Sequence, residues 1–370
     1  MAELLNIILG VYCLLVFVLL IGWLRVRRQP MPPRSADGPG ISLIIALRNE
    51  EQNLAGLVRD LSIIAYPPEK FEVILINDHS EDATLANATM FTQNLPFVRV
   101  FDLPGSVAGK KSALGFGINH SRFGIIATTD ADCRFSKHWL SCVGSYYSEG
   151  ATKMVTGGVK LSGGRSFFAR LQKTEFVSLV GATAAAIGLG HPIMCNGANL
   201  SFRKEVFFEV NGYDDNLNIA SGDDEFLMRK VHARYPGGIR FLNYYEAVVS
   251  SKPQSTLSDL FNQRLRWAGK WRHNSDKYTQ LLAAFILISQ ASFVALIALN
   301  IFSMGSALTY IIVKIFLEGI FLTWVGRFLD RPIDVLSFLA LQIVYPLYVI
   351  AVGVSSFFVP YTWKQRNYKQ

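Results

Sequence analysis

Four clusters of polar side chains in this chain combine residue types that could bind an anionic ligand and move a proton. They are Asn77-Asp78-His79-Ser80, Asp130-Ala131-Asp132, Ser221-Gly222-Asp223-Asp224 and Gln263-Arg264-Leu265-Arg266-Trp267. In the first cluster, Asp78 comes directly after a predicted strand, Phe71 to Asn77. A carboxylate at a strand end can accept hydrogen bonds from a nucleobase imide or a ribose hydroxyl. Taken alone, this cluster is more typical of a helix N-cap or a turn.

The second cluster, Asp130-Ala131-Asp132, follows the apolar run Ile125 to Thr129. Two carboxylates one residue apart at a buried strand end repel each other, and a bound cation explains them best. Hard divalent ions take oxygen ligands and bridge to phosphates, and they can neutralise a leaving diphosphate. An exposed acidic turn is the alternative. The apolar strand before the cluster favours a metal site with Asp130 and Asp132 as ligands.

The third cluster places Asp223 and Asp224 before an amphipathic run that ends near Val231. Acidic residues here could simply begin a helix, because a helix N-terminus favours negative charge. A carboxylate on the first turn of a helix is also firmly held and exposed. It could therefore take the proton of an attacking hydroxyl as a general base, and the two interpretations are compatible.

The fourth cluster has helical spacing, because Gln263, Arg266 and Trp267 fall at i, i+3 and i+4 and share one helix face. Arginine can hold a diphosphate through two hydrogen bonds. Tryptophan can stack on a ligand or lie at a membrane interface. An ordinary basic and aromatic interfacial helix explains the pattern equally well, so both interpretations stay open.

Strands alternate with helices around the first two clusters. The apolar runs predict strands at Ile41 to Leu47, Phe71 to Asn77, Phe97 to Phe101 and Gly124 to Thr129, and helices at Glu50 to Ile64, from Glu81 and from Lys110. This alternation predicts an α/β fold with right-handed βαβ units and a parallel sheet. Ligands bind such sheets at the carboxyl ends of the strands, where the Arg48-Asn49-Glu50, Asp78 and Asp130 clusters fall.

The composition predicts that part of the chain lies in lipid. Of the 370 residues, 51% are hydrophobic and only 17% are charged, and the mean hydropathy is +0.27; soluble domains carry about a quarter charged residues. The net charge is +8, but the chain lacks the basic, aromatic-studded soluble segment that would predict a nucleic-acid partner. The four cysteines form no C-x-x-C pair, which fits neither a zinc framework nor a disulfide scaffold.

Apolar segments flank the α/β region on both sides. Residues Leu4 to Leu24 are long enough to span a bilayer and are followed by Arg25, Arg27 and Arg28, so we expect a retained anchor over residues 1–28 with its basic end in the cytoplasm. A linker over residues 29–40 then leads to a cytoplasmic domain over residues 41–273, with an interfacial helix near residues 259–273. Residues Phe167 to Pro192 are glycine-interrupted and have a polar start, so we expect a less regular segment that faces the interface or an acceptor; a membrane span is the alternative.

Residues 274–370 form the C-terminal membrane region. It contains apolar stretches at Leu281 to Phe302, Ala307 to Leu329 and Ile333 to Phe358, each long enough to span. Three spans would place the C-terminus outside, whereas the basic residues of the tail favour the inside. One stretch could therefore be re-entrant or interfacial, and the side of the C-terminus stays open.

The order of the four clusters resembles that of the inverting family-2 glycosyltransferases. Three more segments are similar to the family's opening strand, its G-K-x-x-A-L segment and its acceptor-side strand: Ile41 to Glu51, Gly109 to Leu114 and Asn196 to Arg203. The resemblance covers about Ile41 to Trp267, and the flanking spans resemble the membrane-bound branch that includes ceramide glucosyltransferases and polysaccharide synthases. It implies a GT-A fold with a mostly parallel sheet, flanked by one N-terminal and about three C-terminal transmembrane helices.

The resemblance also implies roles for individual residues. Asp78 would contact the nucleoside beside Asn49 and Glu50, and Lys110 would approach the nucleotide. Asp130 would lie near the ribose or sugar, and Asp132 would bind Mg²⁺ or Mn²⁺. Asp224 would be the base with Asp223 as the alternative, whereas the diphosphate and the acceptor site would be held and shaped by Gln263, Arg266 and Trp267. The chain departs from the family pattern in having Asn77 where an acid is frequent, Asp223 where Glu is common and Gly115 where Asn is usual.

The expected function is transfer of a hexose from a nucleotide-sugar, with UDP as the expected nucleotide, to a lipid or lipid-linked acceptor at the cytoplasmic face of a membrane. A bacterial inner membrane is the expected location. Two alternatives stay open. The first is a processive polysaccharide synthase, and the second is a non-catalytic membrane subunit with an inherited nucleotide-binding fold.

Overall fold

The computed structural model describes residues 2–34, 38–148, 150–217, 219, 221–270, 276–299, 304–364 and 366–368. The chain divides into two compact units. The sheet unit comprises Val26–Ser162 and Ile187–Lys252, and the helical unit comprises Met1–Arg25, Gly163–Ala186 and Pro253–Gln370.

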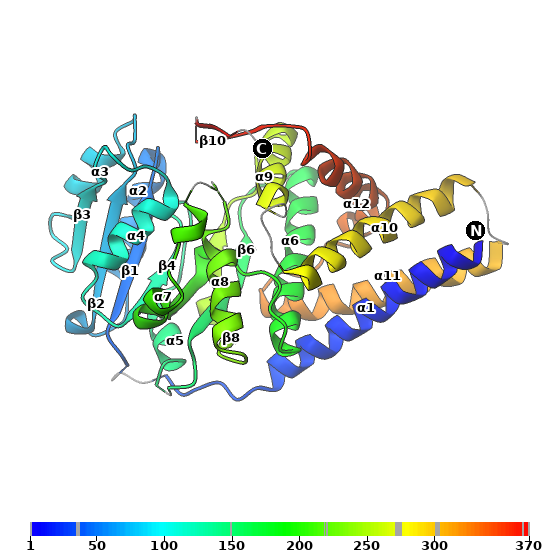
Figure 1. Cartoon of the computed structure of the whole chain (residues 1–370), viewed down its shortest axis with the longest axis horizontal. Helices are drawn as coiled ribbons and strands as arrows, with labels where there is room; N and C mark the ends of the chain where they lie inside the picture. The colour runs from blue at the N-terminus through cyan, green and yellow to red at the C-terminus, as the bar shows by residue number, and fades with distance from the viewer. Residues whose placement is uncertain are drawn as a thin grey trace. The chain divides into compact units, whose positions relative to one another are not determined.

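Within the described residues of the sheet unit, seven strands form one sheet in the order β3-β2-β1-β4-β7-β5-β8 (Figure 1). These strands are β1 (Ile41–Leu47), β2 (Phe71–Asn77), β3 (Val98–Asp102), β4 (Ile125–Thr128), β5 (Met154–Gly157), β7 (Leu200–Arg203) and β8 (Ile239–Leu242). All paired neighbours run parallel except β7, which is antiparallel to both β4 and β5. Strands β6 (Val159–Leu161) and β9 (Val249–Ser251) pair in parallel as a small second sheet. The predicted α/β architecture with a mostly parallel sheet is confirmed.

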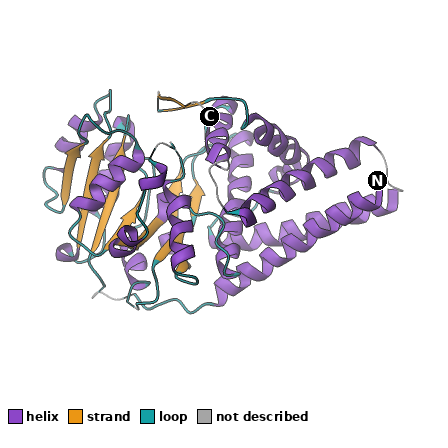
Figure 2. Cartoon of the chain, viewed as in Figure 1, coloured by secondary structure: helices purple, strands orange, loops and turns teal. Residues whose placement is uncertain are grey.

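Helices connect and cover the strands of the large sheet, as Figure 2 shows. They are α2 (Glu51–Ser62), α3 (Thr84–Thr92), α4 (Lys110–His120), α5 (Trp139–Ser145), α7 (Lys204–Glu209) and α8 (Asp223–Arg234). Helix α4 packs on β1 and β2 at Gly117, where a Cβ atom would lie 2.8 Å from Cδ1 of Ile76. Because β2 and β4 lie on opposite sides of β1, the strand order reverses at β1. The carboxyl ends of β1 and β4 therefore flank the place where α/β sheets bind ligands.

The predicted strands and helices differ from the observed ones mainly at their ends. Strand β3 is shifted by one residue from the predicted Phe97 to Phe101, and α3 begins at Thr84 rather than near Glu81. The intervening residues form a turn that hydrogen-bonds to the turn after β1, for instance from the Glu81 N–H to Oδ1 of Asn49 at 2.9 Å. This pairing between two turns replaces the first turn of the predicted helix.

A buried carboxylate, Glu72, ties three segments together near the amino end of β2. It is fully buried and accepts hydrogen bonds from the Ser42 hydroxyl at 2.7 Å and from the Arg122 N–H at 2.5 Å. The guanidinium groups of Arg99 and Arg122 lie 2.8 and 3.1 Å from its Oε2 atom. Burial alone would raise the pKa of Glu72, but these donors outweigh burial and hold the pKa below its ordinary value of 4.5.

We expect Glu72→Gln to lower the free energy of unfolding at pH 7 by about 2 kcal/mol, because it removes charge-assisted hydrogen bonds at a buried site. A depressed folded-state pKa stabilises the fold above the unfolded pKa, and this contribution is lost as pH falls through the folded pKa. The difference between wild type and variant should therefore shrink below about pH 4. Urea unfolding of the full chain in detergent measures it. Glu69→Gln, at an exposed glutamate, is the control, and an equal loss in both variants would contradict the assignment.

The helical unit contains the apolar helices. Its elements are α1 (Ala2–Arg28), α6 (Phe167–Gly188), α9 (Leu257–Gly269), α10 (Lys277–Leu299), α11 (Met304–Phe328), α12 (Val335–Ser355) and the short hairpin β10 (Tyr361–Trp363) with β11 (Arg366–Tyr368). Among the described residues, four helices are long and apolar enough to cross a membrane: Glu3–Arg28, Lys277–Ile297, Leu308–Phe328 and Val335–Ser355. The predicted one N-terminal and three C-terminal helices are confirmed. The interfacial helix predicted near residues 259–273 corresponds to α9, and residues 271–273 lie outside the described residues.

The segment predicted to be less regular, Phe167 to Pro192, is instead a continuous helix of 22 residues over most of its length. Gly181 does not interrupt it. A Cβ atom there would lie 2.8 Å from side-chain atoms of both Phe321 and Val325, so the glycine lets α6 pack closely against α11. The prediction was wrong because the glycine was taken as a helix breaker, whereas its small size serves packing between helices.

The long apolar helices run in defined directions relative to one another. Tyr12 donates to Oε1 of Glu318 at 2.6 Å, and ten residues further along α11 the Phe328 ring lies 5.6 Å from that of Trp23. Both contacts advance along the chain together, so α1 and α11 are parallel. Helix α12 runs antiparallel to α11, since Gly319 lies near Phe338 whereas Lys314, earlier in the chain, bonds to the later Gln342.

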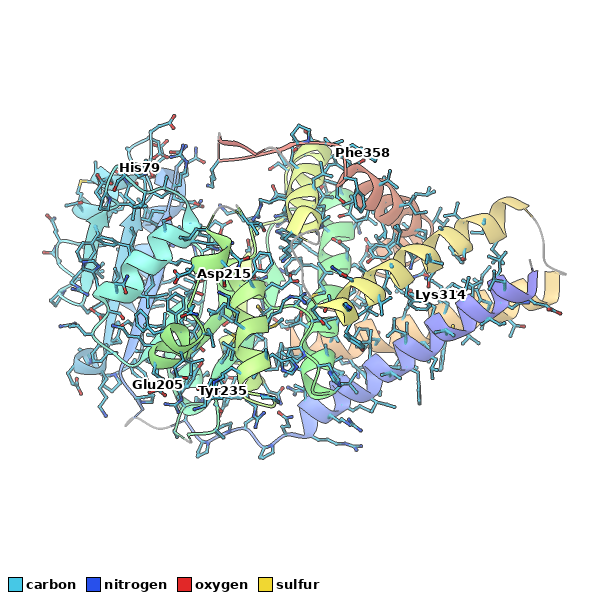
Figure 3. The ribbon with its side chains drawn as sticks, viewed as in Figure 1. His79, Glu205, Asp215, Tyr235, Lys314 and Phe358 are labelled. Atoms are coloured by element: carbon cyan, nitrogen blue, oxygen red, sulfur yellow. The ribbon has the colours of Figure 1, made fainter. Side chains whose placement is uncertain are left out.

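A polar network links three of these helices at Lys314, which is labelled in Figure 3. Lys314 is buried and lies 3.0 Å from the Glu318 carboxylate on the next turn of α11. Gln342 of α12 accepts from Lys314 and donates to Oε2 of Glu318 at 2.9 Å. With the Tyr12 hydroxyl of α1 donating to the same carboxylate, the network joins the first, third and fourth of the apolar helices.

Candidate active site

The turn after β2 presents Asp78 at the carboxyl edge of the sheet. Its Oδ1 atom accepts from the Gly109 N–H at 2.9 Å and lies 3.2 Å from Nδ1 of His79. Gly109 adopts φ 101°, a conformation that side chains rarely permit, and the residue after it begins α4. Asp78 is therefore held between the sheet and the start of α4. Asn77 donates to Oδ1 of Asp102 of β3 at 2.7 Å. An acid is frequent at this position in the family that the sequence resembles.

Asn49 and Glu50 lie in the turn after β1 and bond to neighbouring backbone and side chains. The Asn49 N–H donates to the Ser80 hydroxyl at 3.0 Å, and the Glu50 N–H donates to Oγ1 of Thr84 at 2.7 Å. Glu50 also accepts from the Asn53 side chain at 2.7 Å. These contacts shape the edge of the site next to Asp78. The predicted contact of both residues with substrate stays a prediction.

Lys110 brings the second and third clusters together, although they are about ninety residues apart in sequence. Its Nζ atom lies 2.8 Å from Oδ1 of Asp130 and 3.2 Å from Oδ2 of Asp223. Burial opposes the charge on Lys110, but the two carboxylates outweigh burial and raise its pKa well above 10.5. Burial would likewise raise the pKa of Asp223, yet Lys110 lowers it. Both groups are therefore charged at neutral pH.

Asp224, the next residue, has a different set of partners. Its Oδ2 atom accepts from the Gly197 N–H at 2.9 Å, and its Oδ1 atom accepts from the Glu225 N–H at 2.7 Å. Gly197 lies so close that an added Cβ atom would be 3.1 Å from Oδ2 of Asp223. Gly222, with φ 80°, makes the left-handed turn that aims the first residues of α8 at this point. Sequence reasoning grouped Gly197 with an acceptor-side strand, and the structure places its N–H on the candidate base.

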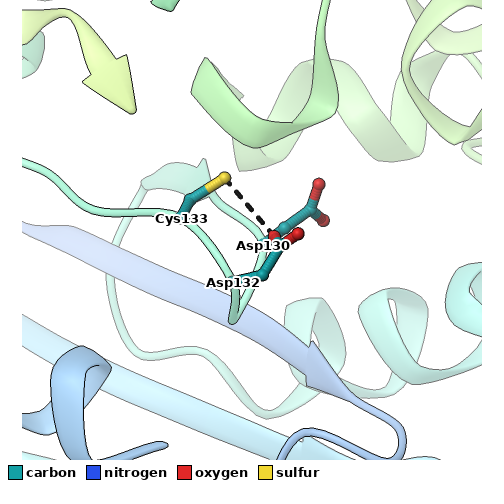
Figure 4. A group of neighbouring side chains, drawn as sticks. All are labelled: Asp130, Asp132 and Cys133. Atoms are coloured by element: carbon teal, nitrogen blue, oxygen red, sulfur yellow. Dashed lines mark hydrogen bonds between the residues drawn. The ribbon is translucent and has the colours of Figure 1, made fainter. Parts of the chain in front are cut away.

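The acidic turn after β4 is a candidate cation site (Figure 4). One ligand atom each from Asp130, Asp132 and Cys133 lie within 4.8 Å of one another. Burial, followed by the charges of Asp132 and Asp130, raises the pKa of the Cys133 thiol well above 9.0. The thiol is therefore protonated and donates to Oδ1 of Asp132 at 3.6 Å. The two carboxylates remain as oxygen donors, and this donor set fits Mg²⁺ or Mn²⁺.

Gln263, Arg266 and Trp267 belong to α9 of the helical unit, where all three are partly exposed. The buried member of this segment is Arg264, which sequence reasoning did not single out. Its guanidinium lies 2.5 Å from Oε2 of Glu175 on α6 and 4.3 Å from the centre of the Trp267 ring. Arg264 also donates to Oε1 of Gln263 at 2.9 Å. One buried arginine therefore fixes the side chains of two predicted site residues.

A signal for this ion pair was present in the sequence. Glu175 is the last acidic residue before a long apolar stretch, and an isolated acid in such a position usually has a basic partner, because an unpaired buried charge is costly. The sequence did not say which of several basic residues that partner would be.

Comparisons with known proteins bear on this site. Residues 42–210 match the family model described as "Glycosyl transferase family 2". The chain is 26% identical over 233 residues to the poly-beta-1,6-N-acetyl-D-glucosamine synthase of Staphylococcus aureus, covering 62% of this chain and 54% of that protein. It is 25% identical over 242 residues to glycosyltransferase AglE of Haloferax volcanii, covering 62% and 71%. The chain thus spans about half the length of the synthase.

Among solved structures, the mannosyltransferase PcManGT from Pyrobaculum calidifontis, in complex with GDP-Man and Mn²⁺, is similar over 97% of this chain and 99% of that chain. The TM-score is 0.64 and the sequence identity is 16%, so the similarity is one of fold. Together with the family match, it confirms the predicted GT-A-like fold.

Proposed function

We propose that this protein is a membrane-anchored inverting glycosyltransferase, a proposal supported by the match of residues 42–210 to the family model. It moves a hexose from a nucleotide-sugar to a lipid or lipid-linked acceptor. The observation that carries the proposal is the meeting of Asp130, Asp223 and Asp224 around Lys110 and Gly197. This arrangement supports a cation site and a general base close to the carboxyl end of β4, beside the reversal point of the sheet, where ligands bind.

The residues divide the reaction between them. Asp224 takes the proton of the acceptor hydroxyl, whose oxygen attacks the anomeric carbon as the bond to the nucleoside diphosphate breaks. Asp223 is less suited to this role, because Lys110 holds it as an ion pair. A single displacement inverts the anomeric configuration. Asp78, fixed by the Gly109 N–H, binds the nucleoside, and Asn49 and Glu50 shape that edge of the site.

Asp130 and Asp132 would hold Mg²⁺ or Mn²⁺, which would supply charge neutralisation for the departing diphosphate. The fold neighbour PcManGT was solved with Mn²⁺ and GDP-Man, which supports a divalent cation and argues for testing GDP-sugars beside the expected UDP-sugars. Gln263, Arg266 and Trp267 complete the proposal as the residues that hold the diphosphate and shape the acceptor site.

The direction of the apolar helices supports a cytoplasmic catalytic face. Since α1 and α11 run parallel, Arg25 near the end of α1 and Arg327 near the end of α11 lie at the same end of the helical unit. Basic residues at span ends mark the cytoplasmic side, and the sheet unit follows α1 directly at this end of the helix. We propose a bacterial inner membrane as the location.

A second candidate is processive synthesis of a polysaccharide, which the similarity to the Staphylococcus aureus synthase favours. Both candidates share the chemistry of one transfer and differ in what happens to the product. Product length separates them: one added sugar per acceptor supports single transfer, and a ladder of longer products supports a synthase.

The first test is nucleotide release from UDP-, GDP- and dTDP-sugars by the purified full chain in lipid with Mn²⁺ and membrane lipid extract. We expect one donor to be turned over in a metal-dependent way. A protein that binds and turns over none of these donors would overturn the proposal and favour a non-catalytic subunit.

A further inference from the structure

The side chain of Arg134 folds back over the acidic turn that it follows. Its Nη1 atom donates to the carbonyl oxygens of Ala131 at 3.2 Å and Cys133 at 2.6 Å. These two residues flank Asp132 in the sequence. A single guanidinium group therefore bridges the backbone on both sides of Asp132.

The same guanidinium ties the acidic turn to α2. Its Nη2 atom donates to the carbonyl oxygen of Asn53 at 2.9 Å, and its Nε atom lies 4.0 Å from the Asp60 carboxylate. The backbone of Arg134 is fixed as well, since it exchanges two hydrogen bonds with Ser250 at 2.8 and 2.7 Å. The turn is thus held between α2 and β9.

Gly56 provides the space for this arrangement. A Cβ atom on Gly56 would lie 2.6 Å from both Cζ and Nε of Arg134, closer than carbon atoms normally approach. Glycine in the middle of a helix is less stable than alanine by about 1 kcal/mol. The helix forgoes this stabilisation at a position where a methyl group would push the guanidinium away.

We propose that Arg134 is a positioning residue that orients Asp130 and Asp132 for the divalent cation, and that Gly56 makes room for it. The inference rests on the proposed function, since it concerns the cation site of that function. Partners that orient metal ligands through hydrogen bonds typically contribute about 10–100-fold to metal affinity.

Electrostatics alone predicts the opposite change in cation affinity when Arg134 is removed. A guanidinium beside a cation site repels the cation, so its removal should strengthen cation binding if charge were its only contribution. If the guanidinium instead holds the turn in shape, its removal weakens binding. The direction of the change therefore distinguishes positioning from charge.

The test titrates Mn²⁺ alone into the purified full chain and measures the free hexaaqua ion by electron paramagnetic resonance. Asp132→Ala defines the background. We expect Arg134→Ala and Gly56→Ala each to raise the Mn²⁺ dissociation constant by about tenfold or more. Arg59→Ala, which removes an exposed arginine from the same helix as Gly56, should leave the constant unchanged.

Thermal unfolding of each variant shows whether it is folded. An unchanged or lower dissociation constant in either folded variant would overturn the positioning role. If wild type itself binds no more Mn²⁺ than Asp132→Ala, the cation site of the proposed function fails and the positioning role fails with it.

Discussion

Asp224→Asn is expected to lower kcat for sugar transfer by about 10²–10⁴-fold, the range over which a general base contributes to a reaction. Asparagine has the shape of aspartate and keeps an oxygen that can accept from the Gly197 N–H, which now lies 2.9 Å from Oδ2 of Asp224. The variant should therefore fold and bind the donor as wild type does. Steady-state transfer at saturating donor, with donor affinity measured separately, tests the prediction.

Asp223→Asn is the matched comparison, because the two residues are adjacent on the first turn of α8. Asp223 is the ion-pair partner of Lys110, and Lys110 keeps Asp130 as a second partner at 2.8 Å. The Asp223→Asn substitution should lower kcat by about tenfold or less, as expected for the loss of one partly exposed ion pair. A larger loss in Asp223→Asn than in Asp224→Asn would exchange the roles of the two carboxylates.

Asp132→Ala is expected to abolish the stimulation of nucleotide release by Mn²⁺, lowering turnover by about 10²–10³-fold, because charge stabilisation by a metal ion contributes several kcal/mol. Chelation of the metal in wild type should have the same effect. Titration of nucleotide release against Mn²⁺ measures it in both proteins.

Cys133→Ala serves as the control at the adjacent position. The thiol is buried and its pKa is raised well above 9.0, so it is a protonated neighbour of the carboxylates. Its removal should change turnover by about threefold or less, since Mg²⁺ and Mn²⁺ take oxygen ligands. A loss as large as that of Asp132→Ala would mean that the thiol is a ligand.

The strands that could be predicted from the sequence are those with long apolar runs. β1 and β2 are seven residues each and almost wholly buried, so they read as continuous hydrophobic segments. β5 and β8 are only four residues long, and their sequences Met-Val-Thr-Gly and Ile-Arg-Phe-Leu form no continuous apolar run. The antiparallel β7 was recognised only through a family resemblance, because strand direction is set by pairing between distant segments.

The residues of the candidate site likewise fall into those that could be predicted from the sequence and those that could not. Asp78 and Asp130 could be placed because each follows an apolar strand, and parallel strands bring their carboxyl ends to one edge. The contacts of Lys110 with Asp223 and of Arg134 with α2 at Gly56 join segments far apart in the chain. No local pattern encodes such pairs, and they become visible only after the helices have packed.

The polar network at Lys314 has a consequence for how the protein is made. In the proposed membrane anchor, an insertion machinery that releases helices into lipid one by one would handle α11 while it carries a lysine and a glutamate. Such a charged residue is unfavourable by about 2.5–3.5 kcal/mol at the centre of a span. Their pairing at i and i+4 reduces this cost, but Tyr12 belongs to the first apolar helix and Gln342 to the last. The hydrogen bonds of α11 are thus completed only after α12 has left the ribosome. In a chain truncated before α12, α11 would lack its Gln342 partner and would be less stably inserted in the bilayer. Such a chain should be degraded faster than the full chain.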